Sequence, residues 1–262
     1  MKIKDKIVVI TGAAQGIGAA MAECFATAGA AGLVLCDLDS QQVGTVAQAL
    51  PLSPDKRLGM RCDVAVKEQV EHVVSAAIQR FGRIDMFCSN AGIIVTGDER
   101  TPVADWQKAW DINVMAHVHA ASAVLPSMLE RGEGYLLNTV SAAGLLTSPG
   151  AAPYAVSKHA ALAFSEWLSI TYGNSGIGVS ALCPQAIRTK MIEDAIASGA
   201  GGAVASGGDM LEPAQVARQA LEGVEAGRFL ILSHPETQRY VEAKASNVDR
   251  WISGMRKFVS KA

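Results

Sequence analysis

The chain has few cysteines, and their spacing matches neither a disulfide framework nor a zinc site. The five are Cys24, Cys36, Cys62, Cys88 and Cys183. They are odd in number and contain no C-x-x-C pair, whereas disulfide-stapled domains and zinc sites carry evenly paired or closely spaced cysteines. The five histidines do not cluster at ligand spacing either. We therefore expect no metal site, and the unpaired thiols favour a reducing, cytoplasmic location.

A strong charge of either sign is also missing. The 262 residues include 23 Lys and Arg and 25 Asp and Glu, for a net charge of −2. A basic stripe is the usual mark of nucleic-acid or anionic-membrane binding, so we expect neither kind of partner. No apolar stretch approaches the ~20 residues of a membrane span, and the apolar run near the N-terminus is too short for a signal peptide.

What the chain does have is a glycine-rich segment, TGAAQGIG, at residues 11–18. It lies between an apolar run typical of a buried strand, at 7–10, and an amphipathic run typical of a helix, at 19–28. Glycines at such a turn let the backbone approach a dinucleotide pyrophosphate, which the helix N-terminus attracts. The spacing is G-x-x-x-G-x-G rather than the commoner G-x-G-x-x-G. On these residues alone, an ordinary strand-to-helix turn remains an alternative.

Strand-like and helix-like segments alternate along the whole chain. Apolar strand patterns are found at residues 7–10, 32–36, 58–62, 84–89, 135–140, 177–182 and 228–232. Helical patterns are found at 17–28, 40–50, 66–80, 103–130, 153–172 and 213–225, and we expect Pro126 to bend or end the fourth of these. The alternation predicts an α/β fold, a doubly wound seven-stranded parallel sheet in a three-layer αβα arrangement. No linker divides the chain, so we expect a single domain over residues 1–262.

Polar or backbone-shaping residues follow nearly every predicted strand. After the glycine turn these are Asp37, Asp63, Asn90-Ala91-Gly92, Ser141 and Pro184. In an open parallel sheet the ligand lies outside the carboxyl ends of the strands, so these residues should surround one site.

Asp37 points to the identity of the cofactor. It ends the second strand about twenty residues beyond the turn, where a carboxylate can bind the ribose hydroxyls of NAD and would repel the 2′-phosphate of NADP. Positions 13–15 of the turn carry no basic residue. Both observations favour NAD. The alternative is that Asp37 only caps the following helix, for which Asp39 and Ser40 are better placed.

Tyr154 and Lys158 lie four residues apart, on one face of a predicted helix close to Ser141. An ordinary phenol has a pKa near ~10, and a neighbouring ammonium lowers it towards the range useful for proton transfer. The three side chains together are suited to moving a proton to or from a carbinol oxygen while a hydride moves to or from carbon.

These motifs resemble those of the short-chain dehydrogenase/reductase family, over essentially the whole chain. The matching residues are Thr11-Gly12…Gly16-Ile17-Gly18, Cys62-Asp63-Val64, Asn90-Ala91-Gly92, Asn113-Val114, Ser141, Tyr154…Lys158 and Pro184…Thr189. The resemblance implies a Rossmann-type fold and a dimer or tetramer, formed through the long helices after strands four and five and through the C-terminal strand.

The resemblance also implies individual roles. Tyr154 is the expected general acid/base, and Lys158 lowers its pKa and binds the nicotinamide ribose. Ser141 positions the substrate oxygen, and Asn113 holds a water that relays protons from Lys158 to solvent. The expected cofactor-binding residues are Gly12, Gln15, Gly16, Ile17, Gly18, Asp37, Leu38, Asp63, Val64, Asn90, Ala91, Gly92, Tyr154, Lys158, Pro184, Ile187 and Thr189.

The substrate side is less readable. The family commonly has Pro-Gly after the sixth strand, whereas this chain has Pro184-Gln185, and Gln185 is either a substrate-binding group or a tolerated turn residue. The expected cavity residues, mostly apolar, are Ile93, Ile94, Ser141, Ala143, Leu145, Leu146, Gln185, Met191 and Ile192. The segment at 195–209 is almost all Ala, Gly and Ser, and with its flanks, at about 188–212, it is either a surface loop or a substrate lid.

The C-terminal tail, at about 235–262, carries Tyr240, Trp251 and Met255 in an amphipathic helical pattern. It is expected either to pack at a subunit interface or to close the substrate cleft of its own or a neighbouring subunit. Taken together, the sequence predicts an NAD-dependent oxidoreductase that interconverts an apolar secondary alcohol and its ketone. The alternatives are an NADPH-dependent ketone or 3-oxoacyl reductase and, from another class, a dinucleotide-binding protein without catalysis.

Overall fold

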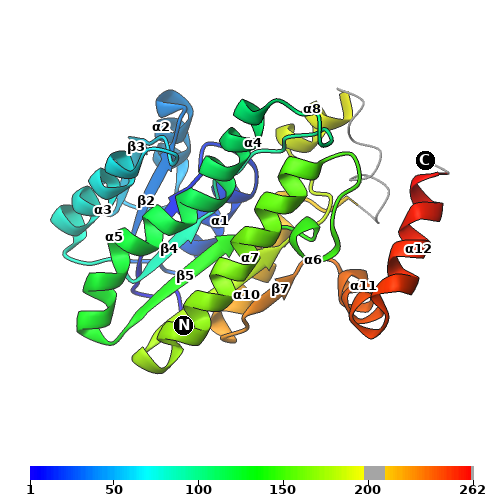
Figure 1. Cartoon of the computed structure of the whole chain (residues 1–262). Coiled ribbons are helices and arrows are strands. Elements are labelled where there is room, and N and C mark those ends of the chain that lie inside the picture. The colour runs from blue at the N-terminus through cyan, green and yellow to red at the C-terminus, as the bar shows by residue number, and fades with distance from the viewer. Residues whose placement is uncertain (198–209, 261–262) are drawn as a thin grey trace.

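A computed structural model describes residues 1–197 and 210–260 (Figure 1). Its described strands form one parallel sheet in the order β3-β2-β1-β4-β5-β6-β7. The strands are β1 Ile7–Thr11, β2 Gly32–Asp37, β3 Arg57–Arg61, β4 Met86–Ser89, β5 Gly134–Thr139, β6 Ile177–Cys183 and β7 Leu230–Leu232. The predicted seven-stranded, doubly wound αβα fold is confirmed. The strand order reverses direction between β1 and β4, which is where such sheets bind ligands.

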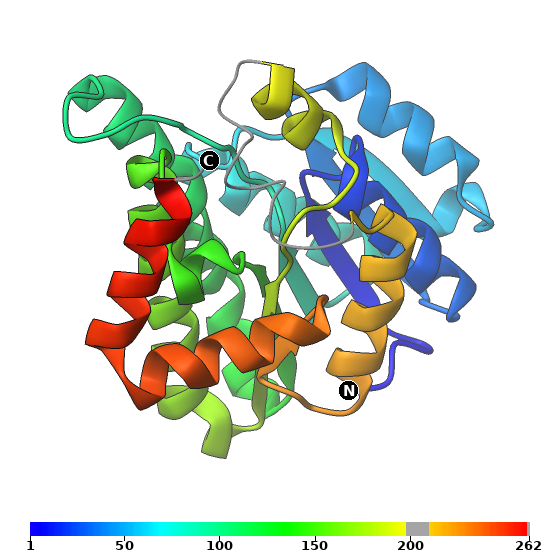
Figure 2. The same cartoon turned by 90° about the vertical axis from the view of Figure 1, so that its right-hand side faces the viewer.

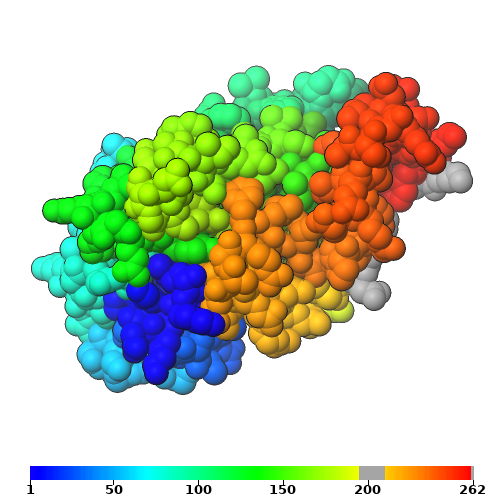
Figure 3. All heavy atoms as spheres, turned by 90° about the horizontal axis from the view of Figure 1, so that it is seen from below, coloured from blue at the N-terminus to red at the C-terminus, as the bar shows by residue number. Residues whose placement is uncertain are grey.

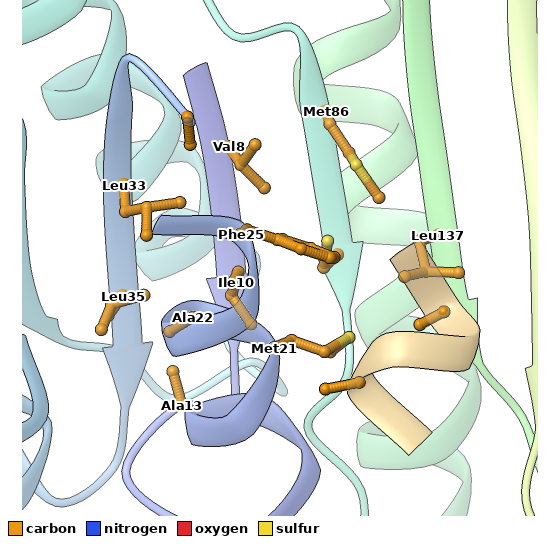
Figure 4. Packing of buried hydrophobic residues seen from close by; sticks show 14 of the residues in the cluster. Val8, Ile10, Ala13, Met21, Ala22, Phe25, Leu33, Leu35, Met86 and Leu137 are labelled. Carbon is orange, nitrogen blue, oxygen red and sulfur yellow. The ribbon is translucent and has the colours of Figure 1, made fainter. Parts of the chain in front are cut away.

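Helices cover both faces of the sheet. The major helices are α1 Gly16–Thr27, α2 Ser40–Ala49, α3 Lys67–Phe81, α4 Val103–Trp110, α5 Ala116–Arg131, α7 Ala152–Tyr172 and α10 Pro213–Glu225. One apolar core lies between the sheet and α1, α2 and α10, with Phe25 and Met21 packed on Val8 and Ile10 (Figure 4). A second core on the opposite face includes residues of α3, α5 and α7. Burial on both faces explains why the central strands are continuously apolar.

The long helical segment after β4 differs from the prediction. Helices α4 and α5 are joined by a π-helical turn, Asp111–Met115, and Pro126 lies inside α5 without ending it. Proline removes one helical N–H. The carbonyl left without that donor belongs to Ser122, which is exposed, so water can satisfy it. The expectation that Pro126 could end this helix is therefore wrong.

The expectation that no segment approaches a membrane span in length also needs correction. Val103–Arg131 forms 29 residues of continuous helix, long and apolar enough by composition to span a bilayer. Half of its most apolar window is buried, and α5 packs on α3, β4 and β5. Burial of one side of this helical segment against the sheet and α3 therefore explains its apolar composition.

Several short elements complete the fold. These are the helices α6 Ala143–Leu146 and α8 Lys190–Ala197, and 3-10 turns at Pro54–Lys56 and Gly173–Ser175. The tail forms the expected helical pair, α11 Pro235–Ser246 and α12 Val248–Val259. Helix α11 contacts α6 (Figure 1), and Figure 3 shows the tail at one end of the molecule, with its two helices seen from another side in Figure 2. Most of the Ala/Gly/Ser segment, residues 198–209, lies outside the described residues.

Candidate active site

The glycine turn after β1 is shaped by close backbone approaches. Gly12 has φ +64°, and a Cβ there would lie 2.8 Å from the Cα of Ala91. A Cβ on Gly18 would lie 2.1 Å from the carbonyl oxygen of Gly12. No side chain fits at either place, so the start of α1 stays bare. Such a turn is suited to receiving a pyrophosphate.

Asn90 ties the turn to the end of β4. Its side-chain amide donates hydrogen bonds to the carbonyl oxygens of Thr11, at 3.0 Å, and Gly12, at 3.3 Å. Its amide oxygen accepts a hydrogen bond from Thr139 at the end of β5, at 3.1 Å. The Thr11 hydroxyl in turn accepts from the backbone N–H groups of Asn90 and Ala91. Asn90 therefore fixes the mutual positions of three strand ends.

Asp37, the last residue of β2, and Asp63, just after β3, have different local roles. The Asp37 carboxylate accepts hydrogen bonds from the N–H groups of Ala14, at 3.1 Å, and Asp39, at 3.2 Å. The Asp63 carboxylate accepts from the N–H of Ala65 at 3.0 Å. Both aspartates line one cavity, at the neighbouring ends of β2 and β3. The helix-capping alternative for Asp37 fails, because Asp39 caps α2 by accepting from the N–H of Gln42.

Ser141, Tyr154 and Lys158 converge between β5 and α7, as the sequence predicted. Ser141 and Tyr154 both line this site, and the Ser141 hydroxyl accepts from the N–H of Ala143 at 3.1 Å and donates to the carbonyl oxygen of Pro184 at 3.4 Å. The Lys158 ammonium lies 5.8 Å from the centre of the Tyr154 ring and donates to the carbonyl oxygen of Thr139 at 3.0 Å. Phenol, hydroxyl and ammonium are therefore held in one site.

The acidities of this site differ from the expectation. Burial raises the pKa of the Tyr154 phenol, and the polar Ser141 side chain offsets part of that rise. Burial also lowers the pKa of the Lys158 ammonium to about 8. The predicted lowering of the Tyr154 pKa by Lys158 is therefore not found. Desolvation of the phenolate outweighs any effect of the ammonium, which is itself buried and donates to the Thr139 carbonyl oxygen.

Asn113 lies in the π-helical turn rather than in regular helix. Its amide oxygen accepts from the N–H of Ile93 at 2.9 Å, and its amide nitrogen donates to the carbonyl of Ile93 and to Ser157, each at 3.0 Å. Ser157 donates to the carbonyl of Tyr154 at 2.8 Å. A π-turn re-aims side chains and is frequent at functional sites. Here the turn lets Asn113 bind Ser157, which in turn binds the backbone of Tyr154. Ser157 was not among the residues predicted from the sequence.

A cavity of about 260 Å³ runs along the strand ends. Its lining contains all the predicted cofactor-binding residues except Gly18, together with Gln185 and Met191. Gly18 and Asn113 lie behind this surface, where each supports residues of the turn or the cavity wall. The first cavity therefore has the position and the lining expected of a dinucleotide site.

A second cavity, of about 330 Å³, adjoins the first. Five residues line both cavities, namely Ile94, Ser141, Tyr154, Gln185 and Ile192. Ala143 and Leu146 line the second, as predicted for the substrate side. Leu145 lines neither cavity, because it packs on the core around Val140 and Ala161. The expectation that Leu145 faces substrate is thus corrected, since a short helix turns it inward.

One wall of the second cavity is formed by the C-terminal tail, for which the sequence left the place open. Tyr240 comes from α11, and Trp251, Met255 and Phe258 come from α12. The spacing of the last three, i, i+4 and i+7, is that of one helix face, a signal present in the sequence. The tail therefore borders a cavity of its own chain. Gln185 contacts it as well, donating to the Thr237 hydroxyl at 2.5 Å.

The fold and the site define a dinucleotide-binding α/β oxidoreductase, and comparisons with known proteins agree. The short chain dehydrogenase family profile matches residues 6–198. The 1-deoxy-11-beta-hydroxypentalenate dehydrogenase of Streptomyces exfoliatus is 31% identical over 97% of this chain and 92% of its own. The levodione reductase of Leifsonia aquatica is 35% identical over 74% of each chain.

A solved structure extends the agreement to the fold. A short chain dehydrogenase/reductase from Burkholderia phymatum, in complex with NAD, superposes with a TM-score of 0.86 at 30% identity, covering 95% of this chain and 96% of that one. The chain belongs to the short-chain dehydrogenase/reductase family. It is accordingly an oxidoreductase of small-molecule alcohols and ketones.

Proposed function

We propose that this protein is an NAD-dependent oxidoreductase that interconverts a secondary alcohol and its ketone, with Tyr154 as general acid/base. The observation that carries the proposal is the position of Ser141 and Tyr154, which line both cavities. A substrate in the second cavity can therefore place its oxygen against the Tyr154 phenol while its carbon faces the first cavity. That is the geometry needed for proton and hydride transfer to the two ends of one C–O bond.

The first cavity fits a dinucleotide cofactor. The bare backbone around Gly12 and Gly18 leaves room for a pyrophosphate, and Asp37 and Asp63 stand where an adenosine would lie. The rest of the cofactor would be held by Asn90 to Gly92, Ile187 and Thr189. The nicotinamide supplies or accepts the hydride when it is bound. The other steps belong to the protein's own side chains.

In the reduction direction, the Tyr154 phenol donates its proton to the carbonyl oxygen as that oxygen gains negative charge. The Ser141 hydroxyl donates a hydrogen bond to the same oxygen and orients it. The raised pKa of Tyr154 keeps the phenol protonated for this role. In the oxidation direction the Tyr154 phenolate takes the proton from the alcohol, with the Lys158 ammonium 5.8 Å from the centre of its ring.

The charges of the side chains around the expected adenosine position favour NAD over NADP. There, Asp37 brings a carboxylate, and the neighbouring described residues Leu38, Cys62, Asp63 and Val64 bring no positive charge. A 2′-phosphate would therefore meet repulsion with no compensating cation. An NADPH-dependent reductase remains the competing assignment.

Ligand-dependent melting tests the cofactor, and turnover tests the activity. A ligand that binds only the folded state raises the melting temperature, and at equal concentration the tighter-binding ligand raises it more. We expect NAD to raise it more than NADP at equal concentration. We also expect NADH absorbance to appear when NAD is mixed with a panel of secondary alcohols. Stronger stabilisation by NADP overturns the cofactor assignment, and NAD binding without turnover of any alcohol or ketone favours a non-catalytic protein.

Two coarser properties complete the proposal. Helix α7 exposes Trp167 and Ile170, the latter 82% exposed, and Val103 of α4 is also 82% exposed. Exposed apolar side chains on the outer helices support assembly into a dimer or tetramer through this surface. A Trp167→Glu change should lower the mass measured by light scattering. The five free thiols support a cytoplasmic location.

A further inference from the structure

The second cavity is enclosed by two parts of the chain that lie far apart in sequence. Ser141 and Tyr154 provide its polar groups beside the first cavity. On another side stand Tyr240, Trp251 and Met255 of the tail. The rings of Tyr240 and Trp251 lie 6.3 Å apart, so they form one continuous apolar surface. We refer to Tyr240, Trp251, Met255 and Phe258 as the tail wall.

The tail wall is held in place mainly through α11. Gln185 donates to the buried Thr237 hydroxyl at 2.5 Å, and the Lys244 ammonium donates to the carbonyl of Leu145 at 2.5 Å. Helix α12 is attached more lightly, since none of its described residues is fully buried. Trp251 and Met255 are nevertheless only partly exposed, because they face the cavity. Helix α12 thus presents apolar side chains to an open space beside the reacting groups.

We propose that the tail wall is the specificity-determining surface for substrate, and that it selects a neutral, ring-bearing, largely apolar secondary alcohol or ketone. This inference rests on the function proposed above and deepens it. The described residues that line the second cavity include no charged side chain, which disfavours an ionic substrate. Flat aromatic surfaces and a methionine favour contact with a compact apolar body.

The size of the cavity agrees with this class of substrate. Small-molecule sites range from ~300 to 1,000 Å³, and this one is near the lower end at about 330 Å³. One small ring with substituents fills more of this volume than a short acyclic alcohol does, and so gains more contact with the tail wall. Gln185 acts here as a positioning residue, because it joins the loop after β6 to Thr237 of α11.

The test compares two substrates across matched variants of α12. Met255→Ala and Trp251→Ala remove cavity-facing groups, and Ile252→Ala removes about the same volume as Met255→Ala from the same helix, at a residue outside the cavity lining. The readout is the ratio of kcat/KM for 4-methylcyclohexanol to kcat/KM for 2-butanol, both with NAD. We expect wild type to prefer the cyclic alcohol. The ratio should fall roughly tenfold in the cavity-facing variants, as lost apolar contacts in a specificity pocket do, and stay unchanged in Ile252→Ala.

A second measurement, of ligand binding without turnover, tests the tail wall independently of the proposed activity. Binding of 4-methylcyclohexanone is followed by tryptophan fluorescence in the wild type and in Met255→Ala, with Trp251→Phe as the spectroscopic reference. Weaker binding in Met255→Ala supports the tail wall even if no alcohol is turned over, a result that would overturn only the proposed function. Equal ratios and equal binding in Met255→Ala and Ile252→Ala overturn the tail wall. So does dissociation of the oligomer in Met255→Ala, which would make α12 a contact with a second copy.

Discussion

The Asp37 carboxylate accepts a hydrogen bond from the backbone N–H of Ala14 at 3.1 Å, which joins the end of β2 to the glycine turn. The same carboxylate lines the first cavity. Asp37 therefore has two functions in one place. It stabilises the turn that would receive the pyrophosphate, and it presents negative charge where the adenosine ribose would lie.

Replacing Asp37 should change the cofactor preference. Asp37→Ala removes both the ribose acceptor and the repulsion of a 2′-phosphate, so we expect NAD affinity to fall about tenfold and the NAD-to-NADP affinity ratio to fall further. Calorimetric titration with each dinucleotide measures both. Asp39→Ala is the matched control, because Asp39 caps α2 and lies outside the cavity lining. It should cost about 1 kcal/mol of stability and leave the ratio intact. An unaltered ratio in Asp37→Ala would remove the basis for assigning NAD.

Tyr154→Phe should separate chemistry from binding. The change removes the proton donor and leaves the ring, so kcat should fall by about 10² to 10⁴. NAD should still raise the melting temperature. Tyr172→Phe is the control, because Tyr172 ends α7 and packs edge-on to Trp167. Turnover retained in Tyr154→Phe would show that another group transfers the proton.

Two glycines in helices should respond to alanine in opposite ways. A Cβ on Gly18 would meet the Gly12 carbonyl oxygen at 2.1 Å, so Gly18→Ala must displace the turn from α1. A Cβ on Gly44 of α2 meets nothing within 4 Å. We expect Gly18→Ala to lower the melting temperature and weaken NAD binding. Gly44→Ala should stabilise the protein by about 0.5 to 1 kcal/mol and leave NAD binding alone. Equal behaviour of the two variants in thermal melts would refute the close packing of the turn.

The sequence could predict those elements that are encoded by residues close together along the chain. The strands of the sheet centre are buried on both faces, so Ile7–Thr11 and Ile177–Cys183 are visible as apolar runs. The glycine turn and the Tyr154–Lys158 pair are local motifs at fixed spacing. The fold places these two motifs near each other, because the carboxyl ends of parallel strands lie along the same edge of the sheet.

The parts that sequence could not predict depend on contacts between distant segments. Leu145 is turned inward by a four-residue helix that no periodicity reveals. The amide of Gln185 is bound to Thr237, 52 positions further along the chain. The amphipathic face of α12 was visible in the sequence, but what it faces depends on how α11 is attached to the body of the protein. The pKa of Tyr154 likewise depends on its three-dimensional burial, which outweighs the effect expected from Lys158 four residues away.

Buried His117 should make the protein less stable in acid. Its ring is 1% exposed, and burial, followed by the positive charge of Lys158, lowers its pKa to about 3, against a smaller opposing effect of Asn138. The folded state therefore keeps His117 neutral where the unfolded chain protonates it, below pH ~6.5. Because the unfolded state binds more protons in that window, the free energy of unfolding falls as the pH falls, by up to about 1.4 kcal/mol per pH unit.

The contribution of His117 can be isolated by comparing slopes rather than absolute stabilities. Between pH 6.5 and 4.5, wild type should lose up to about 3 kcal/mol more unfolding free energy than His117→Gln, whose side chain does not titrate. Urea unfolding at each pH measures this loss, and comparing slopes cancels any constant packing cost of the substitution. His72→Gln, at an exposed position of α3, should follow the wild-type curve. Parallel curves for wild type and His117→Gln would mean that the imidazole gains a proton inside the folded protein, which its burial beside Lys158 opposes.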